Sequence, residues 1–368
     1  MTTERYVRLI AGIFIIVSLI LSQLHSKYWL LFTAFVGANL FQSAITRWCL
    51  MADILAKLGV VYGTDVVPTG AANALQVSDV SFTPLEASNV DRNFIRAYMG
   101  ASENLVGTAF KSLGYSVELV GSGTAGTAPA WGPLLRACGF SETLVALTRV
   151  DYLPISTAFE WIDQYYFADG VLHKLLGCRG TASLDLSSGV IPKIKFQFKG
   201  IDGGIAEGTP AGVDYTTWKT PQVVTDSNTA DLLRGCTHAD TVAPALAAGT
   251  VTPYSKFTLD FGVDAPFIPL IGGESVEIMD RKITGDLELD LTAAQDVSFM
   301  ADVKANTLQS LGLVHGTVVG NKSLIFAPGV QLISPNYGDL SGKLMNTYKL
   351  VLPPTGAGNN ELRIVTSF

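Results

Sequence analysis

The sequence predicts a mainly β protein, with an antiparallel β-sandwich or barrel-like body, one or two short helices, and a two-helix hairpin of the transmembrane type in front of it. Two observations lead to this fold class. Long apolar runs fill the first 50 residues, whereas after Gly59 short segments are separated by Gly, Ser, Thr, Pro and Asp, as in β-rich domains. Several later segments also alternate apolar and polar residues. We expect a hairpin over residues 1–59 and a β body over residues 60–368.

The hairpin is predicted from the absence of charge. Leu9–Ser26 and Tyr28–Thr46 contain no Asp, Glu, Lys or Arg, and these runs of 18 and 19 residues are separated only by Lys27. A helix needs roughly 17 to 25 residues to cross a bilayer. We therefore expect residues 9–46 to form two closely spaced helices that associate with a membrane.

Basic residues lie outside both ends of this hairpin. Arg5 and Arg8 precede or flank the first run, and Arg47 and Lys57 follow the second, so the positive-inside rule places both ends in the cytoplasm. A cleaved signal peptide would begin in a similar way. However, Ser22–Ser26 shows no small-x-small cleavage site and a second apolar run follows, which favours the hairpin.

The charge of the remaining chain excludes one class of function. The whole chain carries −7, and the first 59 residues contain five basic and two acidic residues, so the remainder carries about −10. Tight binding to a phosphate backbone uses clustered Lys and Arg. An acidic body therefore argues against tight nucleic-acid binding.

Alternating segments predict the strands of the body. Between Lys193 and Lys199, the apolar residues Ile194, Phe196 and Phe198 alternate with polar ones, which predicts an antiparallel strand with one buried face. Acidic residues that alternate in this way, such as those near residue 287, could line a pore or keep the sheet soluble. The same period occurs in three further segments: Phe257, Leu259 and Phe261; Val276 and Ile278; and Leu287, Leu289 and Leu291.

Turn and helix signals complete the prediction. Asp169-Gly170 joins two runs of strand formers and predicts a β-hairpin. Short helices are expected within Ala130–Cys138 and within Leu291–Leu311, the second of which Thr292 to Gln295 could open. The glycine-rich stretch Gly200–Thr220 is expected to be a long loop that mediates subunit contacts.

One motif points to a nucleotide-binding enzyme. Residues Gly121 to Gly126 read Gly-Ser-Gly-Thr-Ala-Gly, follow the strand-like segment Tyr115–Val120, and precede Asp151 by 25 residues. Yet Pro129 and Pro133 leave room only for a short helix, and the β pattern downstream contradicts a doubly wound sheet. We favour a Gly/Thr loop over a cofactor site.

Other candidate sites are weak. The four cysteines form no CxxC pair, and Cys236 with His238 makes only a partial metal signal, so we expect free thiols in a reducing cytoplasm. The four histidines lie in unrelated contexts, and no G-x-S-x-G, HExxH or P-loop motif is present. We therefore expect no catalytic, cofactor-binding or metal-binding residues, and no enzyme.

Three segments resemble phage and prophage tail tube proteins over about residues 60–368. They are Tyr62–Asn73, then Thr83-Pro84-Leu85-Glu86, and above all Val117–Phe140, a run that in this family includes the GxGxxG without nucleotide chemistry. The resemblance implies a β-sandwich subunit that forms rings, usually hexameric, stacked into a hollow tail tube in the virion. It implies as partners the chain itself, other phage tail proteins, and DNA that passes through the lumen without specific binding.

The first 59 residues resemble a different family, the YgaP-like inner-membrane hairpin domain. The similarity lies in Arg5, Arg8, Gly12, residues 35–43, Cys49 and residues 54–59. A proline usually follows the cysteine in that family, whereas Leu50 stands here, so no role is carried over to Cys49. Met51 is a possible alternative start, but residues 54–59 fit the end of the hairpin family and favour a fusion.

Two functions from different classes fit this organisation. The first is a tail tube protein that assembles in the host cytoplasm. The second is a membrane-anchored interaction module, built from a tube-like domain on the cytoplasmic face of the inner membrane through residues 9–46.

Overall fold

The chain forms two compact units, residues 1–67 and 68–368. The computed structural model describes residues 3–46, 62–216, 218–239, 244–356 and 358–368. The expected boundary at residues 59 and 60, Cys49 and Met51 lie outside the described residues. Each unit is described by itself.

The first unit contains two helices that contact each other, α1 (Thr3–Leu24) and α2 (Trp29–Thr46). Between them the Ser18 and Thr33 hydroxyls form a hydrogen bond of 2.7 Å, and the rings of Phe14 and Phe32 meet edge to face. The two helices of the prediction are thus confirmed. Over the residues that the structure describes, neither is at once long and apolar enough to count as a membrane span.

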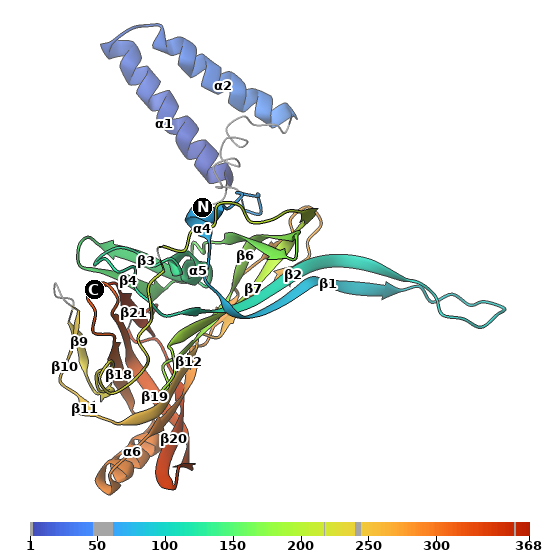
Figure 1. Ribbon diagram of the computed structural model, residues 1–368. Coiled ribbons are helices and arrows are strands. Elements are labelled where there is room, and N and C mark those ends of the chain that lie inside the picture. Colours follow the sequence, from blue (N-terminus) through green and yellow to red (C-terminus); the bar gives the residue numbers. More distant parts are fainter. Residues whose placement is uncertain (1–2, 47–61, 217, 240–243, 357) are drawn as a thin grey trace. The chain divides into compact units, whose positions relative to one another are not determined.

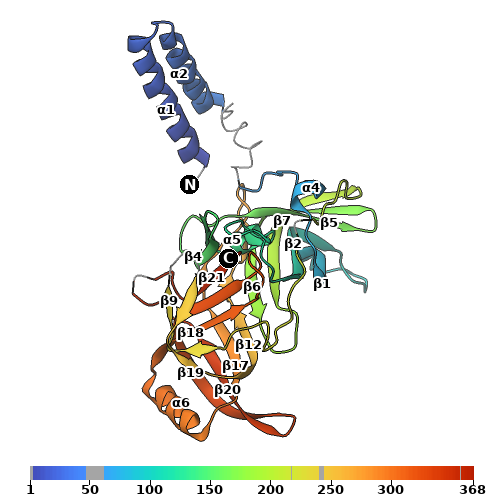
Figure 2. The same ribbon diagram turned by 60° about the vertical axis from the view of Figure 1, so that its left-hand side comes forward.

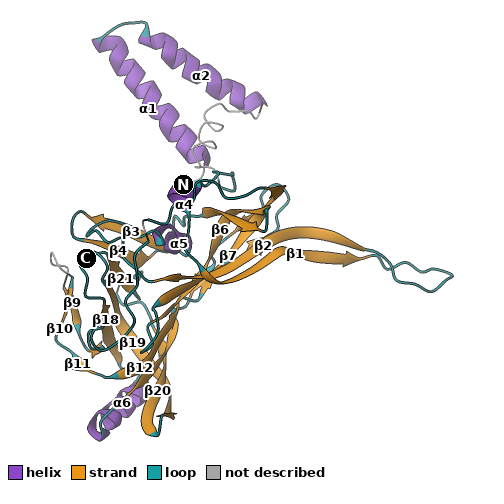
Figure 3. Ribbon diagram, in the orientation of Figure 1, coloured by secondary structure: helices purple, strands orange, loops and turns teal. Residues whose placement is uncertain are grey.

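The second unit is built on one antiparallel sheet of 15 strands, as Figures 1 and 3 show. The predicted mainly β, antiparallel class with few helices is confirmed. Among the described strands the sheet remains open, with β1 and β11 at the ends of its longest path, so no closed barrel forms within this chain. In spatial order this path contains β1 (Ser78–Asp91), β2 (Asn104–Glu118), β7 (Lys193–Glu207), β6 (Val171–Asp185), β12 (Tyr254–Asp260), β17 (Thr284–Leu289), β20 (Lys343–Val351), β19 (Ser323–Leu340), β18 (Leu308–His315), β8 (Leu233–Arg234) and β11 (Thr250–Val251).

Shorter strands extend this sheet or form small ribbons beside it. Four strands branch from the path: β5 (Ile162–Ala168) on β6, β21 (Arg363–Thr366) on β19, β4 (Arg149–Pro154) on β21, and β3 (Phe140–Val145) on β4. Three two-stranded ribbons pair β9 (Thr237–Ala239) with β10 (Ala245–Ala247), β13 (Val263–Asp264) with β16 (Asp280–Arg281), and β14 (Phe267–Ile268) with β15 (Ser275–Val276).

The sheet twists and bends along its length (Figure 2), and the buried apolar side chains of its strands form a single core. Strands that are far apart along the path contribute to this core, and Phe140 of β3 packs on Phe261 beyond β12 with ring centroids 5.2 Å apart. Trp131 lies fully inside, and its indole N–H donates to the Val120 carbonyl at 2.7 Å. Burial of this face supplies the main driving force for folding.

The alternating segments occupy their predicted places. Ile194, Phe196 and Phe198 are at most 1% exposed on β7, and the apolar residues of β12 and β17 are buried as well. Asp169 and Gly170 both have positive φ, at 46° and 84°, and form the tight turn between β5 and β6. This geometry suits a two-residue hairpin turn with two left-handed residues.

The two predicted helices are present, with shorter bounds. Residues Gly132–Ala137 form α5, and Ala293–Ala305 form α6. Helix α6 begins with a capping box, in which Thr292 accepts a hydrogen bond from the Gln295 backbone while the Gln295 side chain accepts one from the Thr292 backbone. A further turn of helix, α4 (Gly70–Asn73), was not predicted.

The loop expected over Gly200–Thr220 is wrong in its first part, because β7 continues to Glu207. The glycines in this part of β7 let the neighbouring strand lie close, and they do not form a flexible loop. A Cβ on Gly200 would lie 2.6 Å from the Cys178 sulfur, and one on Gly203 would lie 2.8 Å from the Leu176 side chain. Glycine is therefore required at these positions, where β7 pairs with β6.

Replacement Phe196→Asp tests the two faces of β7. The new carboxylate would have to enter the core or be expelled from it, so the free energy of unfolding should fall by at least about 3 kcal/mol in urea titrations. The matched control Gln197→Asp adds the same charge on the exposed face and should change stability by no more than about 0.5 kcal/mol. Equal effects of the two changes would show that the faces are assigned wrongly.

Candidate functional site

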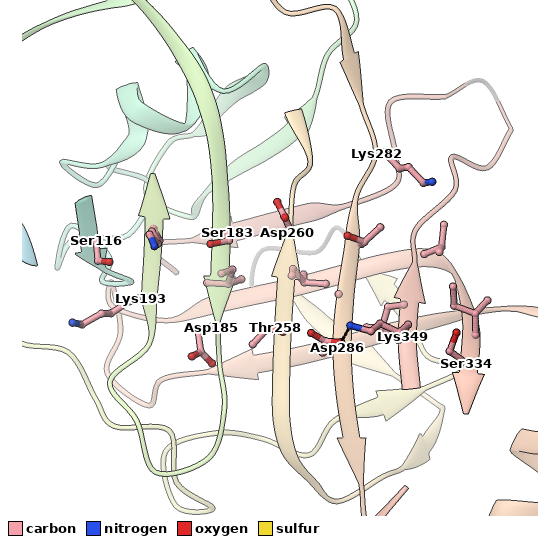
Figure 4. A pocket seen from close by; sticks show the side chains of 18 of the residues that line it. Ser116, Ser183, Asp185, Lys193, Thr258, Asp260, Lys282, Asp286, Ser334 and Lys349 are labelled. Carbon is pink, nitrogen blue, oxygen red and sulfur yellow. Dashed lines mark ion pairs between the residues drawn. The ribbon is translucent and has the colours of Figure 1, made fainter. Parts of the chain in front are cut away.

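The polar face of the sheet forms a broad concave surface, shown in Figure 4. It is lined by residues of β2, β6, β7, β12, β17, β19 and β20, together with Asp79 of β1, and encloses about 900 Å³. Directly paired residues continue across all seven strands in one row: Glu118, Lys193, Asp185, Thr258, Asp286, Lys349 and Ile333. Residues directly opposite each other in antiparallel strands project from the same face, so this row crosses the concave surface from one side to the other.

Charges of both signs balance on this surface. Four aspartates and four lysines line it: Asp79, Asp185, Asp260, Asp286, Lys193, Lys195, Lys282 and Lys349. Lys349 Nζ lies 2.8 Å from Asp286 and Lys193 Nζ lies 3.0 Å from Asp79. A surface of this kind offers neither a basic track for phosphates nor a strongly repulsive acidic wall.

The ion pairs also change the titration of the carboxylates. The hydrogen bond from Lys349 is the main cause that lowers the pKa of Asp286, and the hydrogen bond from Lys193 does the same for the pKa of Asp79. Both carboxylates therefore keep their charge to a lower pH than ordinary aspartates.

A long hairpin, which we call the arm, is the second prominent feature (Figures 1 and 3). It consists of the outer parts of β1 and β2 and the connecting residues 92–103. Residues Phe110–Glu118 of β2 pair with β7, and several of them also pair with β1, whereas residues 104–109 pair with β1 alone among the described strands. The arm thus leaves the sheet at Phe110 and projects from the second unit.

The tip of the arm is apolar and exposed, and arginine side chains lie beside its aromatic rings. Phe94, Ile95, Tyr98 and Met99 are all more than half exposed. The Arg92 guanidinium lies 4.7 Å from the centroid of the Phe94 ring, and Arg92 also forms an ion pair with a nearby glutamate. A cluster of large apolar side chains left in water is typical of a contact surface.

The GxGxxG segment serves as structural packing in this fold. It lies between β2 and α5, and only the six residues of α5 follow as helix, so the strand-loop-helix arrangement of a dinucleotide site is not formed. The Gly123 N–H donates to the Gly320 carbonyl and the Gly126 N–H donates to the Ser367 carbonyl. A Cβ on Gly121 would lie 2.2 Å from the Gly320 oxygen, which explains why glycine is needed there.

The cysteine and histidine residues of the described chain do not assemble into a site. Cys138, Cys178 and Cys236 are free and buried, and burial raises the pKa of each thiol. No three potential metal-ligating side chains lie together in the part of the chain that the structure describes. His315 instead hydrogen-bonds to Thr229 and to the Gln222 carbonyl, and burial lowers its pKa.

Sequence reasoning missed both the arm and the extent of the concave surface. The arm strands show no steady alternation, because most of their residues are exposed on both faces. The segment between the two strands did contain a signal for an exposed contact region, because residues 92–99 combine two arginines with four large apolar residues and show no strand pattern. The acidic strand face near residue 287 was recognised, but the lysines that face it come from distant strands.

Substitution Lys349→Met tests the ion-pair network. Since Lys349 depresses the pKa of Asp286 in the folded chain, its removal should raise that pKa toward the unperturbed value of about 3.9 in a ¹³C NMR titration of the carboxylates. The pair stabilises the fold above that pH and loses its effect as the pH falls through the folded-state pKa. Lys282→Met is the matched control, and an equal shift in both variants would contradict the assignment.

Comparison with known proteins agrees with this architecture. The family model for phage tail tube protein matches residues 54–360, and the model for the transmembrane domain of YgaP-like inner membrane proteins matches residues 1–59. The two matches overlap at residues 54–59, outside the described residues. No curated protein matches the chain. Because the first match covers most of its length, the chain belongs to the phage tail tube protein family.

Proposed function

We propose that this chain is a structural, non-enzymatic subunit of a phage tail tube, in which copies form rings, usually of six, that stack into a hollow tube for DNA. The assembly forms in the host cytoplasm and becomes part of the virion tail with other tail proteins. The observation that supports self-assembly is the arm, whose exposed apolar tip projects beyond the chain's own core. Membership of the tail tube family supplies the context.

A second copy of the chain is the partner that best suits the arm. Exposed apolar residues gain free energy when another protein covers them. The open sheet edge at β1 adds unpaired backbone groups that a neighbouring subunit can satisfy.

The concave polar surface is the part of the subunit that best suits a lumen. A wall for passing DNA must be wetted and must not hold phosphates tightly. Equal numbers of aspartates and lysines, several of them paired with one another, meet both requirements. DNA would then move along this wall without specific binding.

Expression of residues 60–368 tests assembly. This fragment retains the whole second unit and should form rings or stacked hollow tubes in negative-stain electron microscopy at high protein concentration. A product that stays monomeric at every salt and protein concentration would contradict the proposed self-assembly.

The double substitution Ile95→Asp and Met99→Asp tests the arm within that fragment. Two charges at the tip should abolish ring stacking, because they would have to be buried in the contact, while thermal unfolding remains unchanged. Ile271→Asp is the control, since Ile271 is equally exposed in another loop. Normal tubes from the arm variant would show that the tip makes no contact in the assembly.

We also propose, as the second candidate function, that the hairpin anchors the chain to the inner membrane. Within the described part of α1 and α2 the burial is inverted relative to a soluble protein. Ser18 and Ser22 are at most 6% exposed, whereas Ile16, Leu31 and Phe35 are each more than half exposed. Small and hydroxyl-bearing residues between helices, with large apolar residues outside, are typical of helix pairs in lipid.

Cell fractionation tests this anchor. The full chain should remain in the membrane pellet after a high-salt wash and enter solution with detergent, whereas residues 60–368 should be found in the soluble fraction or in assemblies that need no detergent. A full chain that is extracted by salt alone would argue against the anchor.

A further inference from the structure

We infer that the buried ammonium group of Lys111 is a clamp that fixes the direction in which the arm leaves the sheet. The inference rests on the proposed function only in the role given to the arm, which is contact with a second copy. Without the clamp, the second unit would keep its core but present the arm tip in a range of directions.

Lys111 occupies a position where the strand pattern calls for an apolar side chain. Leu113, Tyr115 and Val117 follow it on the same face of β2 and are all buried in the core. The Lys111 side chain is itself completely buried. A fully buried lysine is rare unless its charge is paired, so its surroundings must compensate for the lost hydration.

Three acceptors provide this compensation. Lys111 Nζ lies 2.6 Å from a carboxylate oxygen of Asp202, 2.8 Å from the Gly204 carbonyl and 3.2 Å from the Lys174 carbonyl. An ammonium group has three N–H donors, and each has an acceptor here. The contacts join β2, which carries the arm, to β7 and β6, which belong to the body.

The acceptors are available because the strands are irregular at this point. The pairing of β6 with β7 shifts register between His173 and Leu175, next to the Lys174 carbonyl. On β7 the Asp202 carboxylate also accepts a hydrogen bond from the Gly204 N–H at 2.8 Å, which forms a local turn of the backbone. The two irregular segments thus aim their oxygen atoms at the ammonium group.

The arm would be weakly held here without the clamp. Opposite Lys111, the pairing of β1 with β2 shifts register between Thr83 and Glu86, and the intervening segment contains Pro84, which has no N–H to donate. The pairing of β2 with β7 also ends at Phe110, one residue away. Ladder hydrogen bonds are therefore lost on both sides of β2 where the arm begins.

Aromatic packing supports the same junction but cannot set its direction alone. The Phe82 ring lies 4.7 Å from the Tyr166 ring and 4.8 Å from the His173 ring, measured between centroids. Such contacts tolerate sliding and tilting of the rings. Three directed hydrogen bonds from one charged group impose a narrower geometry.

Distance measurements between two spin labels test the clamp in the full chain, dispersed in detergent. The labels are placed through Ala101→Cys at the tip and Ser188→Cys on the body, both exposed positions, in a Cys49→Ser background. The unaltered junction should give one narrow distance distribution. Lys111→Met, which keeps the length of the side chain but has no donors, should broaden the distribution or shift its maximum while a cooperative thermal transition remains.

Two variants serve as controls. Lys193→Met removes the ion pair with Asp79, which also joins β7 to β1 but lies away from the junction, and should leave the distribution unchanged. Asp202→Asn keeps an acceptor oxygen and should retain a narrower distribution than Asp202→Ala. Should Lys111→Met fail to fold, the Asp202 pair provides the same comparison, because the Asp202 side chain is a third exposed and tolerates change.

The inference is contradicted if Lys111→Met, or Asp202→Ala in its place, gives the same distance distribution as the unaltered chain. It is also contradicted if Lys193→Met broadens the distribution as much as Lys111→Met does. Its role in assembly is overturned if a folded Lys111→Met chain with a mobile arm still forms normal tubes. Failure of the unaltered chain to assemble would instead contradict the proposed function, and the distances measured on dispersed chains would still decide the clamp.

Discussion

Register across the main sheet is the constraint on which the rest of the larger unit depends. Side chains alternate between faces, so a shift of one residue would move Phe196 and Phe198 into water and bring Lys195 into the core. The same register places Lys349 opposite Asp286. The apolar core and the charge-balanced concave surface are therefore two consequences of one strand pairing, and neither can change without the other.

Much of the local structure could be predicted, because local physical rules determine it. The alternation of apolar and polar residues predicted β7, β12 and β17. Asp169-Gly170 predicted the turn between β5 and β6, and the Thr292 capping box predicted the start of α6. The order of strands, and hence the full concave surface, depends on pairings between distant segments that composition does not encode. The arm escaped prediction because exposure on both faces removes periodicity, and β7 was cut short because its glycines resembled loop residues.

The role of Lys111, a lysine where the strand pattern calls for an apolar residue, can be inferred only from the folded structure. In sequence it is one lysine within a strand, but in the fold it occupies a core position and meets oxygen atoms from two other strands. An apolar residue there could fill the space but could not direct the arm. In the proposed function, assembly depends both on a sheet that folds within one chain and on an arm held at a defined angle.

In the proposed tail tube, the core lies inside the subunit, the arm faces a neighbouring copy and the concave polar surface faces the DNA. The most direct test is a cryo-electron microscopy reconstruction of the assembled protein. We expect hollow tubes in which the surface bearing Lys195, Asp260 and Lys349 lines the central channel. Tubes in which this surface faces outward or lies between subunits, or the absence of any tube, would contradict the account.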